Sequence, residues 1–248
     1  MPGNSLNARI PKKIKGVFST ETATRASGRK KVYVYVEEDH DGNILAQPIN
    51  KNLVPSGPKK VMSRDRLLKS YLPEPSMYLN EVAPRMRSLE QHVDRADRHR
   101  KKQELFTAEF EYKNALRVDE EHIRATFGLA LTYLDRGEKD NAEVIFKRLV
   151  GLKGAFEEKH KHLFNEFGIK LRKNKMYDQG LQYYSRAYKL CRNDEHLLHN
   201  IARIWYEKGR LGKAMDAIEE ALELNPDFKR GQAFLKFMKK KMYSLDRL

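Results

Sequence analysis

Residues 198–226, LHNIARIWYEKGRLGKAMDAIEEALELNP, decide the fold of this chain. Apolar residues recur there every three or four positions in two runs, as they do on one face of an α-helix. Gly209 separates the two runs, and glycine accepts the left-handed backbone that commonly ends a helix. Pro226 follows the second run, where a helix has to stop. The stretch therefore predicts two short amphipathic helices joined by a tight turn.

The pattern of the second run occurs four times along the chain. A small residue marks the same position in each copy, at spacings of 34, 38 and 34 residues: Ala108, Ala142, Gly180 and Ala214. Four positions later each copy has a large apolar residue: Tyr112, Phe146, Tyr184 and Ile218. Repeats of this length are typical of stacked helix pairs, because one pair cannot bury its own apolar face.

The four copies resemble the tetratricopeptide repeat family. The last copy matches the family pattern almost position for position, at Leu198, Ile201, Ala202, Trp205, Ala214, Ile218 and Pro226. The resemblance implies an all-α fold, a right-handed α-solenoid of about four helix pairs. It places a tetratricopeptide domain at 76–248, with repeats at 89–122, 123–156, 161–194 and 195–228 and a capping helix at 229–246.

The two ends of the predicted solenoid differ from its inner repeats. In the first repeat His92, Arg95 and His99 occupy positions where apolar residues belong, so we expect its first helix to be an exposed end. The capping helix carries a predicted inner stripe of Ala233, Phe234, Phe237, Met238 and Met242. Its lysines, Lys236, Lys239, Lys240 and Lys241, are expected to face water.

The first 75 residues follow a different pattern. Residues 1–30 contain Gly, Ser, Thr and Lys with few apolar residues, and are expected to form a disordered basic arm. Residues 31–75 predict a small β-hairpin segment, with strands at 32–38 and 44–49 around an Asp/Gly/Asn turn and a third short strand at 61–62. Pro48 suggests that the second strand lies at a sheet edge. Ser63 is the predicted N-cap of a helix over 64–71.

The charge of the chain is unevenly distributed. There are 49 Lys and Arg against 34 Asp and Glu, a net charge of +15. Residues 1–70 have 14 basic and 6 acidic side chains and residues 229–248 have 7 and 1, so the middle is close to neutral. No signal peptide or transmembrane run is visible, and Cys191 is the single cysteine. These features favour a soluble, cytoplasmic protein.

The resemblance implies a function in protein binding. In the family the first helices of successive repeats line a concave groove that holds a peptide or helix of a partner protein. Carried over by position, the groove would run from an apolar end near Phe127 to a basic end near Arg203, which suits a partner with apolar and acidic residues. The alternative is a solvated surface without a ligand. The candidate groove residues are Arg124, Phe127, Leu131, Leu134, His162, Asn165, Glu166, Ile169, Arg172, Lys173, His196, His199, Asn200, Arg203 and Tyr206.

Typical catalytic motifs are absent from the sequence, and three histidines are the candidates for a metal site. The sequence has no glycine-rich phosphate loop, no nucleophile elbow and no spacing typical of a nucleophile and its base, so no enzymatic activity and no cofactor is expected. His162, His196 and His199 would face one groove and could bind a metal. Because no carboxylate is fixed beside them by spacing and no HExxH pattern occurs, a polar groove wall is the preferred interpretation.

The basic ends leave a second hypothesis open, a nucleic-acid- or ribosome-associated protein. Lysines and arginines of the arm could neutralise phosphates, and Tyr33 and Tyr35 could stack on bases. The residues concerned are Lys12, Lys13, Lys15, Arg25, Arg29, Lys30 and Lys31. Ordinary strand alternation explains the two tyrosines equally well. The hairpin segment could instead cover the exposed first repeat, which is the interpretation we favour.

Overall fold

The computed structural model describes residues 13–24, 28–152, 154–155, 157, 160–190 and 193–245. The chain divides into two compact units. The sheet unit comprises residues 1–95 and 113–122, and the helix unit comprises residues 96–112 and 123–248. The sequence predicted a boundary at residue 76, whereas residues 76–95 and 113–122, which include the start of α3 (Ala83–Lys101) and the end of α4 (Leu105–Val118), belong to the sheet unit.

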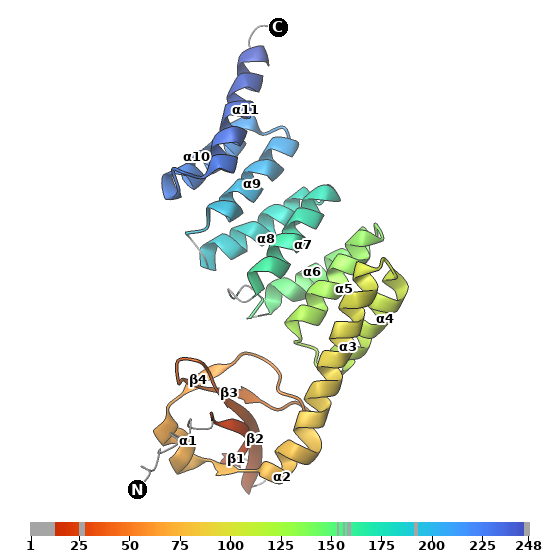
Figure 1. Ribbon diagram of the computed structural model, residues 1–248, viewed down its shortest axis with the longest axis vertical. Helices are drawn as coiled ribbons and strands as arrows, with labels where there is room; N and C mark the ends of the chain where they lie inside the picture. Colours follow the sequence, from red (N-terminus) through yellow and green to blue (C-terminus); the bar gives the residue numbers. More distant parts are fainter. Residues whose placement is uncertain are drawn as a thin grey trace, which may run out of the picture. The chain divides into compact units, whose positions relative to one another are not determined.

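The sheet unit is built on five antiparallel strands in the order β4-β3-β2-β1-β5 (Figure 1). Its strands are β1 (Lys15–Thr24), β2 (Gly28–Glu38), β3 (Ile44–Pro48), β4 (Lys60–Met62) and β5 (Leu72–Pro73). The predicted hairpin and third strand are thus confirmed. β3 is however not an edge strand, because β4 pairs with it at Ile44–Ala46. Pro48 lies beyond that pairing, where its missing N–H costs no ladder bond.

The prediction of a disordered arm over residues 1–30 is wrong where the structure describes that segment. Residues 15–24 form β1, which pairs along its whole length with β2, from Lys15 opposite Glu37 to Thr24 opposite Gly28. Gly28 has φ +78°, a left-handed backbone conformation that suits glycine at the start of the return strand. Residues 1–12 and 25–27 of the predicted arm lie outside the described residues.

One face of the sheet packs on a short helix, α1 (Arg64–Ser70). Ser63 caps this helix as predicted, since its hydroxyl accepts a hydrogen bond from the Arg66 backbone N–H at 3.3 Å. Leu67 is buried with Val36, Ile44 and Ala46 in a common core. After β5 the chain continues through α2 (Pro75–Met77) and one π-helical turn (Tyr78–Val82).

The sheet unit is completed by a segment far along the chain. Asn50 donates a side-chain hydrogen bond to the Val118 carbonyl at 2.9 Å, and Asn52 donates to the same carbonyl at 2.8 Å. These bonds satisfy a carbonyl that has no partner at the C-terminal end of a helix. The Ser56 hydroxyl donates to Asp119 Oδ1 at 2.5 Å. The loop after β3 therefore depends on residues more than sixty positions later.

The remaining helices follow each other in pairs (Figure 1). Their bounds are α3 (Ala83–Lys101), α4 (Leu105–Val118), α5 (Ile123–Asp135), α6 (Lys139–Gly151), α7 (Lys161–Lys173), α8 (Tyr177–Leu190), α9 (Glu195–Glu207), α10 (Leu211–Leu224) and α11 (Lys229–Leu245). From α5 to α10, helices pack pairwise as α5 on α6, α7 on α8 and α9 on α10, and α11 packs on α10. Among the described residues, no helix is both long and apolar enough to cross a membrane.

Close contacts between small and aromatic residues join the helices. A Cβ at Gly168 of α7 would lie 2.2 Å from the Tyr184 ring of α8, so only glycine permits this approach. Phe167 packs edge-to-face on Tyr183 with ring centroids 5.2 Å apart, and on Phe127 at 6.0 Å. The small and large residues of the repeat pattern are buried, so the repeat core consists of the residues that the sequence predicted.

Two expectations about the ends of the solenoid need correction. α3 is not a fully exposed end, because Leu89, Val93 and Ala96 are buried on it while His92 and His99 flank that stripe half-buried. The inner stripe of α11 is also narrower than expected. Met238 is fully buried and Phe234 and Met242 are half-buried, but Ala233 is exposed and Phe237 retains 51% of its accessible surface. The four lysines of α11 are exposed as predicted.

Candidate partner-binding groove between α9 and α11

The exposed residues of α11 have counterparts on α9 at a distance of one repeat. Adding 34 to His196, His199, Asn200 and Arg203 gives Arg230, Ala233, Phe234 and Phe237. α11 therefore corresponds to the first helix of a fifth pair. Since first helices line the same side of a solenoid, these two helices together form one wall. A pocket of about 540 Å³ lies between them, lined by His199, Arg203, Tyr206, Glu207, Arg230, Ala233, Phe234 and Phe237.

Aromatic rings form the apolar part of this pocket. Tyr206 packs edge-to-face on Phe234, with ring centroids 5.7 Å apart, and on Phe237 at 5.6 Å. Phe234 and Phe237 stack nearly parallel at 6.4 Å. His199 packs its ring edge-to-face on Phe234 at 5.6 Å. The rings hold one another in place, which gives the pocket a preorganised apolar surface.

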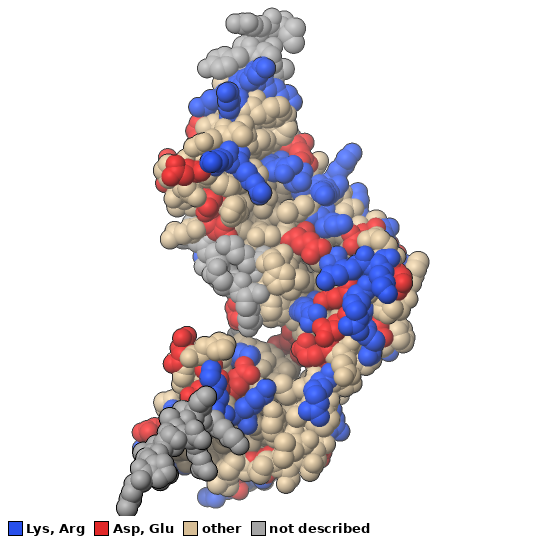
Figure 2. Space-filling view, in the orientation of Figure 1, with Lys and Arg blue, Asp and Glu red and all other residues tan. Residues whose placement is uncertain are grey.

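Positive charge surrounds the aromatic rings. Arg203 and Arg230 line the pocket, and Glu207 is the single carboxylate among its eight lining residues. The Glu207 carboxylate is already paired with the buried Arg172 guanidinium. Lys241 of α11 donates a hydrogen bond to the Tyr206 hydroxyl at 2.8 Å. On the face that Figure 2 shows, Lys and Arg side chains gather over α11. The pocket therefore has an excess of positive charge.

The pKa of His199 reflects this positively charged environment. Burial, together with the positive charges of Arg203, His196, Arg230 and Arg172, lowers the pKa of His199 to about 4. The imidazole is therefore neutral at pH 7 and can donate or accept one hydrogen bond. A carboxylate placed in the pocket would oppose the effect of the cations and raise this pKa.

Further along the first helices, ion pairs connect charged side chains, among them Glu166 of the predicted groove. Arg100 of α3 lies 3.3 Å from Asp135 of α5 and 3.0 Å from Glu166 of α7. Lys170 of α7 also pairs with Asp135. These ties join the first helices of three successive repeats. The Asn165 side-chain oxygen is buried and has no hydrogen-bond partner in the described structure.

The structure corrects part of the predicted groove. Phe127, Leu131 and Leu134 are fully or almost fully buried in α5 and cannot contact a partner. Phe127 is instead part of the packing between α5 and α7. Arg172 is also buried, in its ion pair with Glu207. The predicted apolar end of the groove is therefore core.

The other predicted groove residues keep accessible surface. His162, Lys173, His196 and Arg203 are exposed; Arg124, Asn165, Glu166, Ile169, His199, Asn200 and Tyr206 are half-buried. Arg124 is paired with Asp97 at 2.6 Å. The structure brings His199, Arg203 and Tyr206 together in one pocket. His162 lies outside that pocket's lining.

Sequence reasoning missed the α11 side of the pocket, Arg230, Ala233 and Phe237. The signal was present as the 34-residue shift from α9. The predicted single inner stripe hides this signal, because α11 has a packing face and a groove face. Phe237, which the sequence predicts in the core, lies half exposed beside Tyr206.

The described structure gives little support to a metal site or to a nucleic-acid site at the predicted residues. Rings of His196 and His199 both pack on Phe228, at 5.0 and 5.6 Å, and the described residues contain no cluster of metal-ligating side chains. Tyr35 is 2% exposed and packs against Tyr78, so it cannot stack on a base. Lys31, predicted to meet phosphates, is paired with Glu74 at 2.5 Å. Lys12, Arg25 and Cys191 lie outside the described residues.

Comparisons with known proteins agree with this geometry. Residues 196–228 match the family described as tetratricopeptide repeat. Over 149 residues the chain is 25% identical to anaphase-promoting complex subunit 3 of Schizosaccharomyces pombe. The match covers 58% of this chain and 22% of that relative, so the chain spans about a fifth of the relative's length.

Solved structures of other proteins resemble part of this chain. A crystal structure of MamA protein is 19% identical, with a TM-score of 0.50 over 64% of this chain and 85% of that one. A structure of PilF from Pseudomonas aeruginosa is 16% identical, with a TM-score of 0.49 over 65% of this chain and 72% of that one. The MamA likeness supports the fold of the helices and nothing finer.

Proposed function

We propose, from the premise that the helical part of this chain is a tetratricopeptide-repeat solenoid, that the protein is a non-catalytic adaptor. Its partner would be a protein segment, a peptide or helix, bound against the first helices. The pocket between α9 and α11 is the proposed anchor point. The observation that carries the proposal is the combination of a preorganised aromatic surface with Arg203 and Arg230 in one accessible pocket.

The chemistry of the pocket defines the partner. Exposed faces of Phe234, Phe237 and Tyr206 would bury an apolar or aromatic side chain of the segment. Arg203 and Arg230 would each bind a carboxylate, and a guanidinium can hold one through two parallel hydrogen bonds. The segment therefore carries an acidic residue beside an apolar one. Neutral His199, which also lines the pocket, would supply one further hydrogen bond.

The rest of the partner would follow the accessible first-helix residues toward α7 and α5. Asn165 lies on this path, but its side-chain oxygen is buried, so only the accessible part of this side chain could contact the segment. The residues proposed to continue the groove are Arg124, His162, Asn165, Glu166, Ile169, Lys173, His196 and Asn200. Charged residues at its edge would set the rate of association more than the affinity.

The test is quantitative affinity capture from the cells that make the protein. The wild-type chain is compared with Arg203→Glu and with Phe237→Asp, both at exposed positions of the pocket. Loss of a charge-assisted hydrogen bond costs about 1.5–3 kcal/mol, which weakens binding roughly 10- to 100-fold. The matched control is Lys189→Glu, an exposed α8 lysine that lines neither described pocket.

Partners that are retained by the control and lost by both pocket variants would support the proposal. Circular dichroism of each variant shows whether the helices are intact. If both pocket variants are folded and capture the same proteins in the same amounts as the wild-type chain, the pocket is not the binding site.

A further inference from the structure

The opposite face of α11 also has counterparts on α9. Leu198, Ala202 and Trp205 of α9 pack on α10 in the core of the fourth helix pair. The same shift of 34 residues carries four repeat-pattern positions of α9, Leu198, Ile201, Ala202 and Trp205, onto Gln232, Leu235, Lys236 and Lys239. This face of α11 is therefore the place where the second helix of a fifth pair would pack. The described residues contain no helix after α11.

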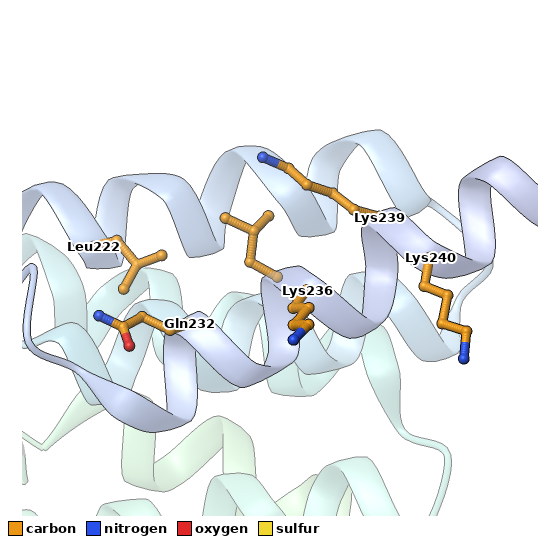
Figure 3. A pocket seen from close by; sticks show the side chains of 6 residues that line it. Leu222, Gln232, Lys236, Lys239 and Lys240 are labelled. Atoms are coloured by element: carbon orange, nitrogen blue, oxygen red, sulfur yellow. The ribbon is translucent and has the colours of Figure 1, made fainter.

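A second pocket lies at that position. Its volume is about 610 Å³, and it is lined by the four residues of α11 together with Leu222 of α10 and Lys240. Figure 3 shows Leu222 and Gln232 at one end and the three lysines spread along the rest. Leu222 and Leu235 supply its apolar floor. Lys239 lies 3.7 Å from Glu219 of α10, an exposed and therefore weak ion pair.

We propose that this pocket binds an acidic amphipathic helix of a partner protein, which takes the place that the second helix of a fifth pair would occupy. The apolar stripe of that helix would cover Leu222 and Leu235, as α10 covers Leu198, Ala202 and Trp205 of α9. Its acidic side chains would pair with Lys236, Lys239 and Lys240. Lysine is suited to this rim because its long stem packs on apolar surface while the ammonium group reaches a carboxylate.

The charge and the residue types of the pocket favour this occupant over a second copy of the chain and over a nucleic acid. A second copy of the chain docked through the same pocket would bring two sets of three lysines together, and like charges across an interface are unfavourable. A nucleic acid would meet the lysines, but the six lining residues include no aromatic ring on which a base could stack. The leucines at helix-packing positions instead match the apolar side of a helix.

A suitable probe exists in the chain itself. The sequence of residues 211–224 forms α10, which packs as a second helix against the equivalent face of α9. It contains one lysine and four acidic residues, a net charge of −3. A fluorescein-labelled, end-blocked peptide of this sequence would be titrated with the full chain and followed by fluorescence anisotropy. A peptide whose acidic residues are replaced by lysine is the control for charge.

The proposal predicts saturable binding of the acidic peptide that weakens with added salt, and no binding of the lysine-substituted peptide. The double variant Lys236→Glu/Lys239→Glu should weaken binding roughly fivefold or more, because two favourable charge pairs become repulsive. Lys189→Glu should bind the peptide as the wild-type chain does. Arg203→Glu should also bind it normally, which separates this site from the proposed α9–α11 groove.

Four results would overturn the proposal. The first is absence of binding by the folded wild-type chain at millimolar peptide. The second is binding that the double lysine variant leaves unchanged. The third is binding of a labelled single-stranded RNA at the same lysines with no binding of the peptide, which would assign the surface to nucleic acid. A concentration-dependent dimer in sedimentation that the double variant abolishes, without peptide binding, would assign it to a second copy.

Discussion

Replacing Gly168 by alanine tests the packing of the helix pairs. The added Cβ would lie 2.2 Å from Tyr184 Cζ and 2.4 Å from its hydroxyl oxygen, far inside van der Waals contact. Tyr184 is 1% exposed and packs edge-to-face on Tyr183 at 5.8 Å, so its ring cannot swing toward solvent. The new methyl group therefore has to separate α7 from α8.

Two opposing effects set the size of the change. Overpacking a buried site typically costs about 1–3 kcal/mol, and the contact with three atoms of one buried ring favours the upper end. Alanine is better than glycine in a helix by about 1 kcal/mol. The expected net effect of Gly168→Ala is a loss of about 2 kcal/mol in the free energy of unfolding.

Gly212 of α10 provides the matched control. Nothing lies within 4 Å of a Cβ built at Gly212, so Gly212→Ala keeps the gain in helix propensity without the clash. It should raise the stability by up to about 1 kcal/mol. The two substitutions are chemically identical and are predicted to have opposite signs.

The assay is urea unfolding followed by circular dichroism, with the free energy taken from the midpoint and slope. A third variant, Tyr184→Leu, removes the ring atoms that meet the new methyl group. In that background Gly168→Ala should lose most of its cost, and the double-mutant cycle measures the difference. If Gly168→Ala is neutral or stabilising in the wild-type chain, or equally costly in both backgrounds, the proposed close contact does not exist.

Three further predictions concern other parts of the chain. Met238→Ala should lower the free energy of unfolding by about 2–4 kcal/mol, because Met238 is fully buried in the core that joins α11 to α10; urea unfolding checks it, and an unchanged midpoint would contradict that packing. The pKa of His199 is lowered to about 4 from its usual 6.5, so the folded chain binds fewer protons than the unfolded chain between these values. The contribution of neutral His199 to the stability of the folded chain is therefore complete above pH 6.5 and is lost as the pH falls toward 4. The melting temperature of His199→Gln should accordingly depend less on pH than that of the wild-type chain. Ser63→Ala should lower the stability of α1 by about 1 kcal/mol, because the helix loses its N-cap. Backbone amides of α1 should then exchange their hydrogens faster, and unchanged protection would show that the cap is dispensable.

Local signals made much of the fold predictable. The turn between β2 and β3 is closed by Asp39, whose carboxylate accepts backbone hydrogen bonds from Asp41 and Asn43 at 2.9 Å, and by Gly42 with φ +81°. Such short-range chemistry is visible in the sequence. The repeat likewise identified the helix pairs, because small and large residues at fixed spacing report one packing arrangement used several times.

Signals that depend on distant partners were missed. Residues 15–24 look polar when considered alone, and only pairing with β2 makes them a strand; Val17, opposite Tyr35, is 1% exposed. In the site, Arg203 and Tyr206 could be predicted because they lie in a complete repeat. Phe237 could not be separated from core residues by hydrophobicity, since an aromatic side chain suits either face of a helix and the position of the neighbouring helix decides between them.

The hydrogen bonds from Asn50 and Asn52 to the end of α4 have a consequence for synthesis on the ribosome. The loop that carries these asparagines leaves the ribosome 65 to 68 residues before its partners at 117–118 do. At about 5–20 residues per second, that interval is roughly 3–13 seconds. During this time the loop after β3 lacks its hydrogen bonds to the end of α4. Each later helix pair, in contrast, packs on a neighbour that is synthesised within one repeat length. A stalled or truncated chain ending before residue 117 would thus present chaperones and proteases with an incomplete sheet unit, and quality control would act first on the amino-terminal part of the protein.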